Sequence, residues 1–293
     1  MSTAAEHTES PNDDGTPHRR NPIGVFDSGI GGLSVLRELL GELPDERYVY
    51  LADSGRAPYG SRPEGEVRAF TLEVADFLVR ERGCKALVVA CNTATAAAAE
   101  ALRVRYPRLP VVAMEPAVKP AARATRNGCI GVLATAGTIG SARYAELLRA
   151  YGAEVEVLED PCRGLVELIE AGADGEPLRR RLREIVTPMR AAGADVLVLG
   201  CTHFPLVSET IGELAGPHVA VIDPAPAVAR QLRRRLREAD LAALALTTEL
   251  ESGHSLVRAY TSGDPAALAS ALRRYVADVP PVVEAVRWTG AGG

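Results

Sequence analysis

Residues 196–203 read Val-Leu-Val-Leu-Gly-Cys-Thr-His, a continuous apolar run that stops at a cysteine and two polar residues. A helical pattern follows almost at once, from Leu206 to Leu214. Such a run before a helix is typical of a strand buried on both faces of a parallel sheet. The stretch therefore predicts an α/β fold with Cys201 at the carboxyl end of a parallel strand, where open α/β sheets bind their ligands.

The pattern occurs twice. Leu87–Thr93 (LVVACNT) is a second apolar run, and it stops at Cys91. The stretches that begin at Ile23 (IGVFDSGIGG) and Ile130 (IGVLATAGTIG) also resemble each other, and each precedes its cysteine by a similar number of residues. This internal repeat predicts two similar halves, each of which contributes a strand-end cysteine to a shared site.

Composition places the chain among globular proteins. It has 293 residues, 47% hydrophobic and 24% charged, with a net charge of −5, and no apolar run approaches the ~20 residues of a membrane span. Met1–Arg20 is polar and lacks the apolar core of a signal peptide. We therefore expect a cytoplasmic protein with five reduced cysteines. The acidic balance argues against nucleic acid as a partner, and we interpret the basic clusters Leu178–Glu184 and Gln231–Glu238 as solvated helix faces.

Alternating apolar patterns and turn residues predict the order of the elements. The expected strands are Ile23–Phe26, Arg47–Leu51, the run ending at Cys91, Pro110–Met114, Ile130–Leu133, Glu154–Leu158, Val196–Leu199, Val219–Ile222, Val257–Thr261 and Val282–Val286. The expected helices are Leu33–Leu40, Glu64–Arg82, Ala94–Arg105, Ser141–Tyr151, Arg163–Ala171, Pro177–Ala192, Leu206–Leu214, Pro226–Asp240 and Asp264–Tyr275.

Prolines mark where the chain passes between the halves. We expect Glu115–Pro120 to be a proline-bracketed turn at the first crossover, and Pro224 and Pro226 to mark the return. The expected organisation is a disordered tail over 1–20, a first α/β domain of 21–114 plus 226–293, and a second α/β domain of 115–225. Both domains would have Rossmann-like parallel-sheet cores, with the active site in the cleft between them.

Cys91 and Cys201 are the candidate reactive groups, because each stands before a helix N-terminus, a position that lowers the pKa of a thiol. His203 lies two residues after Cys201, and Asp27 occupies the matching turn of the first half. An opposed thiolate and thiol suit proton exchange at a carbon atom, since one removes a proton as the other supplies one. The remaining cysteines, Cys84, Cys129 and Cys162, are interpreted as core residues.

Other uses of these residues fit less well. Zinc would need better ligand spacing than Cys-x-His, and a cysteine hydrolase would leave one thiol idle. The glycines of Asp27–Gly32 have the wrong spacing for a dinucleotide site. Pyridoxal phosphate needs a lysine, and the two lysines, Lys85 and Lys119, lie outside the motifs. We therefore expect no cofactor and no metal.

Several motifs, all in one register, resemble those of the glutamate racemases, within the aspartate/glutamate racemase family. They are DSGIGG at 27–32, Asp53-Ser54 with Pro58-Tyr59-Gly60, Cys91-Asn92-Thr93, Thr135 and Thr138 in ATAGTIGS, and Cys201-Thr202-His203. The resemblance covers the chain from about Ile23 to the C-terminal strands. It implies a cofactor-independent enzyme that interconverts L- and D-glutamate and supplies D-glutamate for peptidoglycan.

The resemblance also implies roles for individual residues. Cys91 would take the α-proton from D-glutamate and Cys201 from L-glutamate. Asp27 and His203 would tune the thiols, with Glu167 as the acidic partner near His203 and Glu170 as the alternative. The substrate would be held by Asp27, Ser28, Pro58, Tyr59, Gly60, Asn92, Thr93, Thr135, Thr138, Thr202 and His203.

The expected partner is a small-molecule substrate, bound by a homodimer. Three rival functions stay open at this point. The same chemistry could act on aspartate or a hydantoin, the protein could be a non-catalytic amino-acid-binding member of the fold, or it could associate with DNA through its arginine-rich helices.

Overall fold

The protein contains two parallel β-sheets in the computed structural model, which describes residues 17–243, 256–276 and 282–288. One sheet has six strands in the order β10-β9-β2-β1-β3-β4, and the other has four in the order β6-β5-β7-β8. All ten expected strands are present. They are β1 (Ile23–Asp27), β2 (Tyr48–Ala52), β3 (Ala86–Val89), β4 (Val111–Ala113), β5 (Cys129–Ala134), β6 (Glu156–Asp160), β7 (Val196–Gly200), β8 (Ala220–Ile222), β9 (Val257–Thr261) and β10 (Val283–Ala285).

The two sheets repeat one strand order, since β2-β1-β3-β4 corresponds to β6-β5-β7-β8. In the first sheet Ile23 of β1 lies opposite Ala86 of β3. In the second sheet Ile130 of β5 lies opposite Val196 of β7. The repeat predicted from the sequence is therefore a repeat of topology, and it places the two strand-end cysteines after corresponding strands.

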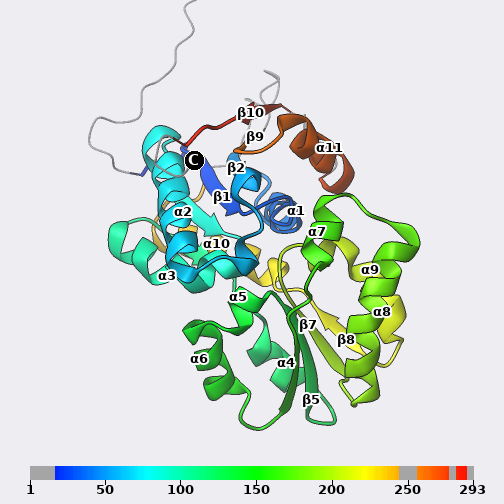
Figure 1. Ribbon diagram of the computed structural model, residues 1–293. Helices are drawn as coiled ribbons and strands as arrows, with labels where there is room; N and C mark the ends of the chain where they lie inside the picture. The colour runs from blue at the N-terminus through cyan, green and yellow to red at the C-terminus, as the bar shows by residue number, and fades with distance from the viewer. Residues whose placement is uncertain (1–16, 244–255, 277–281, 289–293) are drawn as a thin grey trace, which may run out of the picture.

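Helices cover both faces of the six-stranded sheet (Figure 1). Successive residues of a strand point to opposite faces, so Val25 packs into the core on one side and Phe26 into the core on the other. The first core includes α1, α10 and α11, and the second includes α2 and α3. These helices are α1 (Leu33–Glu42), α2 (Glu64–Asp76), α3 (Asn92–Arg105), α10 (Ala225–Glu238) and α11 (Pro265–Tyr275).

The four-stranded sheet, in the lower part of Figure 1, is covered in the same way. Val198 of β7 packs toward α4 and α6, whereas Leu197 and Leu199 pack toward the opposite layer. That layer consists of α7, α8 and α9. The bounds are α4 (Val118–Ala124), α5 (Ala136–Ile139), α6 (Ala142–Tyr151), α7 (Leu165–Glu170), α8 (Gly175–Ala191) and α9 (Ser208–Ala215).

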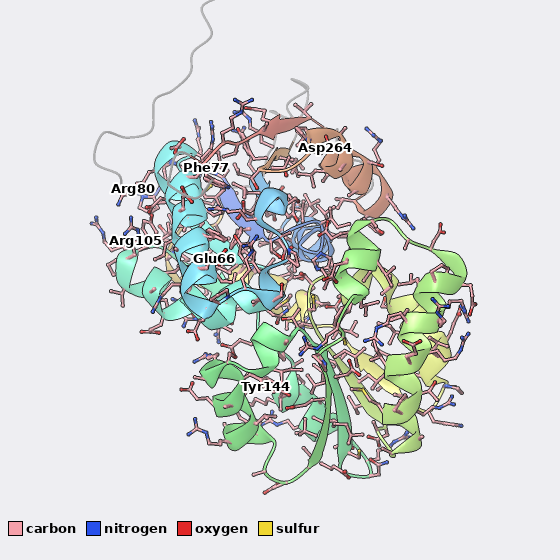
Figure 2. The ribbon with its side chains drawn as sticks, in the orientation of Figure 1. Glu66, Phe77, Arg80, Arg105, Tyr144 and Asp264 are labelled. Carbon is pink, nitrogen blue, oxygen red and sulfur yellow. The ribbon has the colours of Figure 1, made fainter. Side chains whose placement is uncertain are left out.

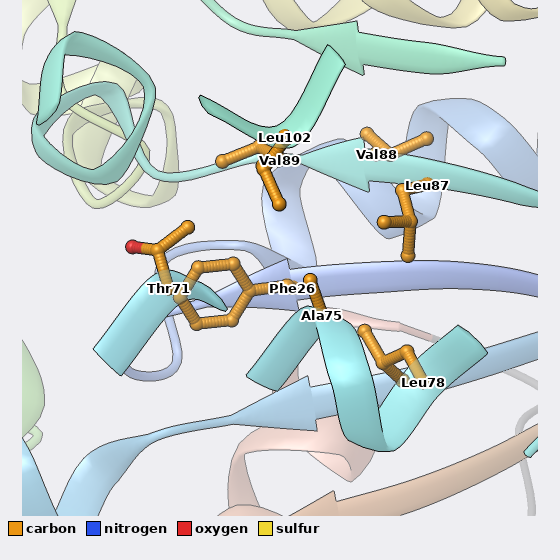
Figure 3. A pocket seen from close by; sticks show the side chains of 8 residues that line it. All are labelled: Phe26, Thr71, Ala75, Leu78, Leu87, Val88, Val89 and Leu102. Carbon is orange, nitrogen blue, oxygen red and sulfur yellow. The ribbon is translucent and has the colours of Figure 1, made fainter. Parts of the chain in front are cut away.

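Charged side chains lie on the outer faces of the helices. Arg80 and Arg105, for example, project from the α2–α3 layer (Figure 2), where each pairs with Asp76. Beneath that layer, Phe26 and its neighbours leave an apolar gap of about 10 Å³ (Figure 3). A space of that size holds at most one water molecule, so the gap is a packing feature of the core and not a ligand site.

The structure differs from two of the expected elements. Val118–Ala124 is helical, where the sequence predicted a turn over Glu115–Pro120. Pro120 is tolerated because it lies in the first turn, where backbone N–H groups have no intrahelical partner. The helix expected over Glu64–Arg82 ends as an α-helix at Asp76 and continues as a π-turn from Phe77 to Glu81.

The chain leaves the six-stranded sheet after β4, builds the second sheet and returns with α10. We propose that each sheet with its helices is one domain, with the boundaries expected from the sequence. Of the tail expected over 1–20, residues 1–16 lie outside the described residues. Arg19 is held in place, because it pairs with Asp240 and its carbonyl oxygen accepts a hydrogen bond from Lys85.

Candidate active site

A cavity of about 440 Å³ is lined by residues from both halves, at the carboxyl ends of their strands. This is the location that the parallel topology predicts. The cavity gathers most of the residues that the sequence singled out. Those that line it are Ser28, Pro58, Tyr59, Gly60, Cys91, Asn92, Thr93, Thr135, Glu167, Cys201, Thr202 and His203.

Asp27 and Thr138 are not among the residues that line the cavity, and their contact with the substrate stays a prediction. Asp27 is fully buried behind the wall, where it accepts hydrogen bonds from the Thr202 hydroxyl at 3.0 Å and the Gly29 N–H at 2.9 Å. The Thr138 hydroxyl lies 3.0 Å from that of Thr135. Both residues therefore support groups that do line the cavity.

Cys91 caps the N-terminus of α3. Its sulfur accepts a hydrogen bond from the Ala94 N–H at 3.5 Å and lies 3.6 Å from the Ser28 hydroxyl. Burial and the nearby charge of Asp27 raise the pKa of the Cys91 thiol to about 12, although the Ala94 and Ser28 hydrogen bonds lower it. The pKa predicted from the helix N-terminus alone was therefore wrong in direction, because desolvation outweighs one backbone N–H.

Cys201 belongs to a different environment. Its sulfur lies 3.6 Å from Nδ1 of His203, and Nε2 of the same ring is 2.6 Å from Oε1 of Glu170. Burial lowers the pKa of His203, but the hydrogen bonds and charges of Cys201 and Glu170 outweigh this and raise it well above its usual value. Burial raises the pKa of Glu170, but His203 and the Ile30 N–H outweigh it, so this pKa is lowered. The His203 ring thus lies between the Glu170 carboxyl group and the Cys201 sulfur.

The acidic partner of His203 is Glu170, so the expected pairing with Glu167 is wrong. Both carboxylates are on α7, and Glu167 lines the cavity without a hydrogen bond to His203. Glu170 is selected by the turn after β1, because its Oε1 also accepts a hydrogen bond from Ile30 N–H at 2.8 Å. Residues three apart share one side of a helix, so spacing alone could not decide between the two.

Two glycines of the 27–32 turn, Gly29 and Gly31, are close to side chains of the other half. A Cβ atom added to Gly31 would lie 2.5 Å from Nδ1 of His203 and 2.5 Å from Oγ1 of Thr202, and one added to Gly29 would overlap Glu170. Glycines in a turn often let a ligand come close to the backbone. The structure shows that Gly29 and Gly31 allow the second half, with its His203–Glu170 pair, to approach the first.

Several lining residues were not predicted. Cys162, interpreted from the sequence as a core residue, lines the cavity with a backbone φ of 48°. Its neighbour Arg163 also lines the cavity and is the one arginine or lysine among the lining residues of the described chain. Ser54 belongs to the Asp53-Ser54 motif, which was a sequence signal. No sequence pattern predicted that Arg163 lines the cavity, because its position depends on the conformation of the turn before α7.

Asn92 lines the cavity with an amide that has no hydrogen-bond partner in the described part of the chain. It is buried at the first position of α3, and within the described residues neither its side-chain oxygen nor its nitrogen has a hydrogen-bond partner. Buried amides nearly always have a partner. Asn92 is thus prepared to bind a polar ligand.

The structure also places the groups considered for a cofactor or metal. Neither lysine lines the cavity: Lys85 pairs with Glu46 at 2.6 Å, and Lys119 lies over the ring of Tyr151. Within 17–243, 256–276 and 282–288, no three His, Cys, Asp or Glu side chains are grouped as metal ligands. No helix in these ranges has the length and apolarity needed to cross a membrane.

Comparison with known proteins identifies the family of the chain. Residues 23–232 match the family model described as Asp/Glu/Hydantoin racemase. The chain therefore belongs to the Asp/Glu/Hydantoin racemase family, as its motifs indicated.

Relatives within that family include glutamate racemases. The enzyme of Stutzerimonas stutzeri (strain A1501) is 51% identical over 252 residues, which are 86% of this chain and 92% of that protein. The enzyme of Pseudomonas paraeruginosa (strain DSM 24068 / PA7) is 56% identical over 216 residues, 73% of this chain and 81% of that protein.

Solved structures match over most of the chain. Escherichia coli glutamate racemase, in complex with L-glutamate and the activator UDP-MurNAc-ala, has a TM-score of 0.79 and 31% identity, and the match covers 92% of this chain and 100% of that one. The Francisella tularensis enzyme in complex with D-glutamate has a TM-score of 0.78 and 30% identity, with 92% and 98% covered. These matches confirm the predicted fold class.

Proposed function

We propose that this protein interconverts L- and D-glutamate through Cys91 and Cys201, without a cofactor. The observation that carries the proposal is that one cavity contains two thiols, each supplied by the corresponding strand of a repeated sheet. Inversion at a carbon centre needs a base on one face and an acid on the other. Two related halves that face one cavity supply that pair.

The two thiols have different surroundings. Nδ1 of His203 lies 3.6 Å from the Cys201 sulfur, whereas a pKa of about 12 keeps Cys91 a thiol at neutral pH. Cys201 then removes the α-proton of L-glutamate, and the Cys91 thiol donates its own proton to the opposite face. The reverse reaction starts with the Cys91 thiolate that this turnover leaves behind.

The remaining lining residues are suited to an amino acid with two carboxylates. Ser28, Thr93, Thr135 and Thr202 offer hydroxyl groups, and Asn92 offers an amide whose polar atoms have no partner in the described chain. Relatives whose structures contain L- or D-glutamate support the choice of substrate. We also infer that the enzyme works in the cytoplasm as a homodimer and supplies D-glutamate for peptidoglycan, as is typical of the family.

The test is proton NMR of the purified protein with L-glutamate in D2O and no added cofactor, together with optical rotation. We expect the α-proton signal to disappear as the rotation falls to zero, since each inversion introduces a solvent deuteron at Cα. Persistence of both the signal and the rotation would exclude racemisation of glutamate. Aspartate, measured in parallel, reports on selectivity within the family.

Single-cysteine variants test the two-base assignment. We expect Cys91→Ala and Cys201→Ala each to lower racemisation by about 10³-fold or more, within the range for loss of a positioned acid or base. Cys91→Ala should still exchange the α-proton of L-glutamate and Cys201→Ala that of D-glutamate, because each keeps the thiol that meets that enantiomer. Near wild-type racemisation in either variant would contradict the assignment.

A further inference from the structure

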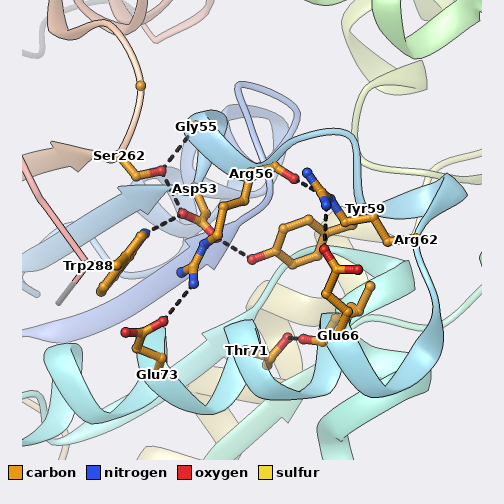
Figure 4. A network of polar contacts seen from close by, with 12 residues as sticks. Asp53, Gly55, Arg56, Tyr59, Arg62, Glu66, Thr71, Glu73, Ser262 and Trp288 are labelled. Carbon is orange, nitrogen blue, oxygen red and sulfur yellow. Dashed lines mark hydrogen bonds and ion pairs between the residues drawn. The ribbon is translucent and has the colours of Figure 1, made fainter. Parts of the chain in front are cut away.

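Asp53 lies outside the cavity and joins segments that are distant in sequence (Figure 4). It follows β2 and is fully buried. One carboxylate oxygen accepts hydrogen bonds from the Tyr59 hydroxyl and from Nε of Arg56, the latter at 2.7 Å. The other accepts hydrogen bonds from the Ser262 hydroxyl at 2.6 Å and from Nε1 of Trp288 at 2.8 Å. Four donors thus satisfy one buried carboxylate.

Tyr59 connects this carboxylate to the cavity wall. Its side chain is 1% exposed, and its ring packs against those of Phe26 and Phe70 with centroids 6.2 and 5.9 Å away. The next residue, Gly60, touches the other half, since a Cβ atom added there would lie 2.8 Å from Cβ of Thr135. The hydrogen bond from the Tyr59 hydroxyl to Asp53 therefore fixes the position of Tyr59 and Gly60. These two residues form the part of the cavity wall, here called the Tyr59 wall, that contacts the other half.

Trp288 connects the carboxylate to the C-terminal segment. It follows β10, which pairs in parallel with β9 at the edge of the first sheet. The Arg56 guanidinium lies 4.5 Å from the centroid of its indole, and Phe77 packs edge-on at 6.1 Å. Arg56 also pairs with Glu73 of α2 at 2.6 Å. The indole N–H is therefore held in place toward Asp53.

We propose that Asp53 is a positioning residue for the substrate and that the Trp288 N–H, donated from the C-terminal segment, keeps Asp53 oriented toward Tyr59. The inference rests on the proposed function, because it takes the Tyr59 wall as part of the glutamate site. Without one donor, the buried carboxylate turns toward the donors that remain, and the Tyr59 wall shifts with it. Neither Asp53 nor Trp288 reaches the cavity, so the effect is on substrate binding more than on proton transfer.

The test is the kinetics of Trp288→Phe, which keeps an aromatic ring beside Arg56 and deletes the N–H. We expect KM to rise about tenfold for both L- and D-glutamate while kcat changes less than about threefold, as for a small displacement of a binding group. Ser262→Ala removes the other donor to the same oxygen, and it is expected to have the same effect. It serves as the test variant if Trp288→Phe does not fold.

Tyr48→Phe is the matched control. Its buried hydroxyl, on β2 of the same sheet, donates to the carbonyl oxygens of Leu39 and Leu43 at 3.0 and 2.9 Å, away from the 53–63 loop. This variant should lower Tm and leave KM unchanged. The proposal is overturned if Tyr48→Phe raises KM as much as Trp288→Phe does, or if Trp288→Phe and Ser262→Ala keep the wild-type KM.

A second readout does not depend on turnover, because Trp288 is the one tryptophan in the sequence. Glutamate should change its fluorescence emission in the wild type, with a midpoint near KM, and Asp53→Asn should abolish the change. If the wild-type enzyme is active but its Trp288 fluorescence does not change with glutamate, Trp288 is not coupled to the substrate site. A wild-type protein that exchanges no α-proton contradicts the proposed function instead, so the two failures are distinguishable.

Discussion

At the scale of single residues, the two buried thiols of the cavity differ in their neighbours. A thiol with a pKa near 12, such as Cys91, holds its proton in neutral solution but is a strong base once it has lost it. A strong base is useful against a weakly acidic C–H group. Cys201 has different neighbours, because its sulfur lies beside the ring of His203, which also contacts Glu170. In the proposed mechanism, the carboxylate that pairs with His203 therefore matters.

We expect Glu170→Gln to lower the free energy of unfolding by about 1.5–3 kcal/mol near pH 6, the value of a charge-assisted buried hydrogen bond. The pKa of Glu170 is lowered, so its contribution exists above its unfolded pKa of about 4.3 and is lost as pH falls through the folded pKa. The pKa of His203 is raised, so its contribution is complete below about 6.5 and is lost as pH rises through the folded pKa.

The difference in stability between wild type and Glu170→Gln should therefore be largest between about pH 4.3 and 6.5. Urea unfolding at a series of pH values measures it. Glu167→Gln is the control, because Glu167 is exposed and has no hydrogen bond to His203. If Glu167→Gln showed the same pH-dependent loss and Glu170→Gln did not, the partner of His203 in solution would be Glu167.

At the scale of elements, the turn between β1 and α1 fits the two halves together. Its glycines have no side chains to separate the first sheet from the His203–Glu170 pair. The same turn gives the Ile30 N–H to Glu170 and places Asp27 under Thr202. The element thus orients cavity residues that belong to the other half.

Gly31→Ala should lower kcat by about 10²-fold, because its Cβ atom would lie 2.5 Å from Nδ1 of His203 and would displace the ring from Cys201. Steady-state kinetics in both directions measure the effect. Gly41→Ala, in α1, has no atom within 4 Å of the added Cβ atom. This control should keep wild-type kcat and gain up to about 1 kcal/mol of stability, since alanine favours a helix. Equal kcat values for the two variants would contradict the proposed role of the turn.

At the scale of the whole molecule, a buried ion pair ties together distant parts of the chain at the other end of the strands. Lys85 and Glu46 are 0% and 3% exposed and lie 2.6 Å apart. The Lys85 ammonium also donates to the carbonyl oxygen of Arg19, and Glu46 accepts a hydrogen bond from the Ala243 N–H at 2.9 Å. Arg19 and Ala243, which are distant in sequence, therefore both contact this buried ion pair.

Lys85→Met should lower the free energy of unfolding by about 3–5 kcal/mol, because it leaves a buried carboxylate without its cation. The kcat of the folded variant should not change, since Lys85 is not part of the cavity. Denaturant unfolding and kinetics on one preparation check both statements. Arg179→Met breaks the exposed pair with Glu213 and should cost at most about 1 kcal/mol. A similar loss in the two variants would show that burial does not decide the effect.

The sequence by itself determined the strands, the repeat and the position of both thiols, because these depend on neighbouring residues. An apolar run followed by a helix places Cys91 and Cys201 at strand ends whatever the rest of the chain does. Only the tertiary structure decided which carboxylate pairs with His203 and which donors surround Asp53. The contact between His203 and Glu170 joins residues 33 positions apart, and the contact between Trp288 and Asp53 joins residues 235 positions apart. They depend on how helices and sheets pack, which the periodicity of the sequence does not predict.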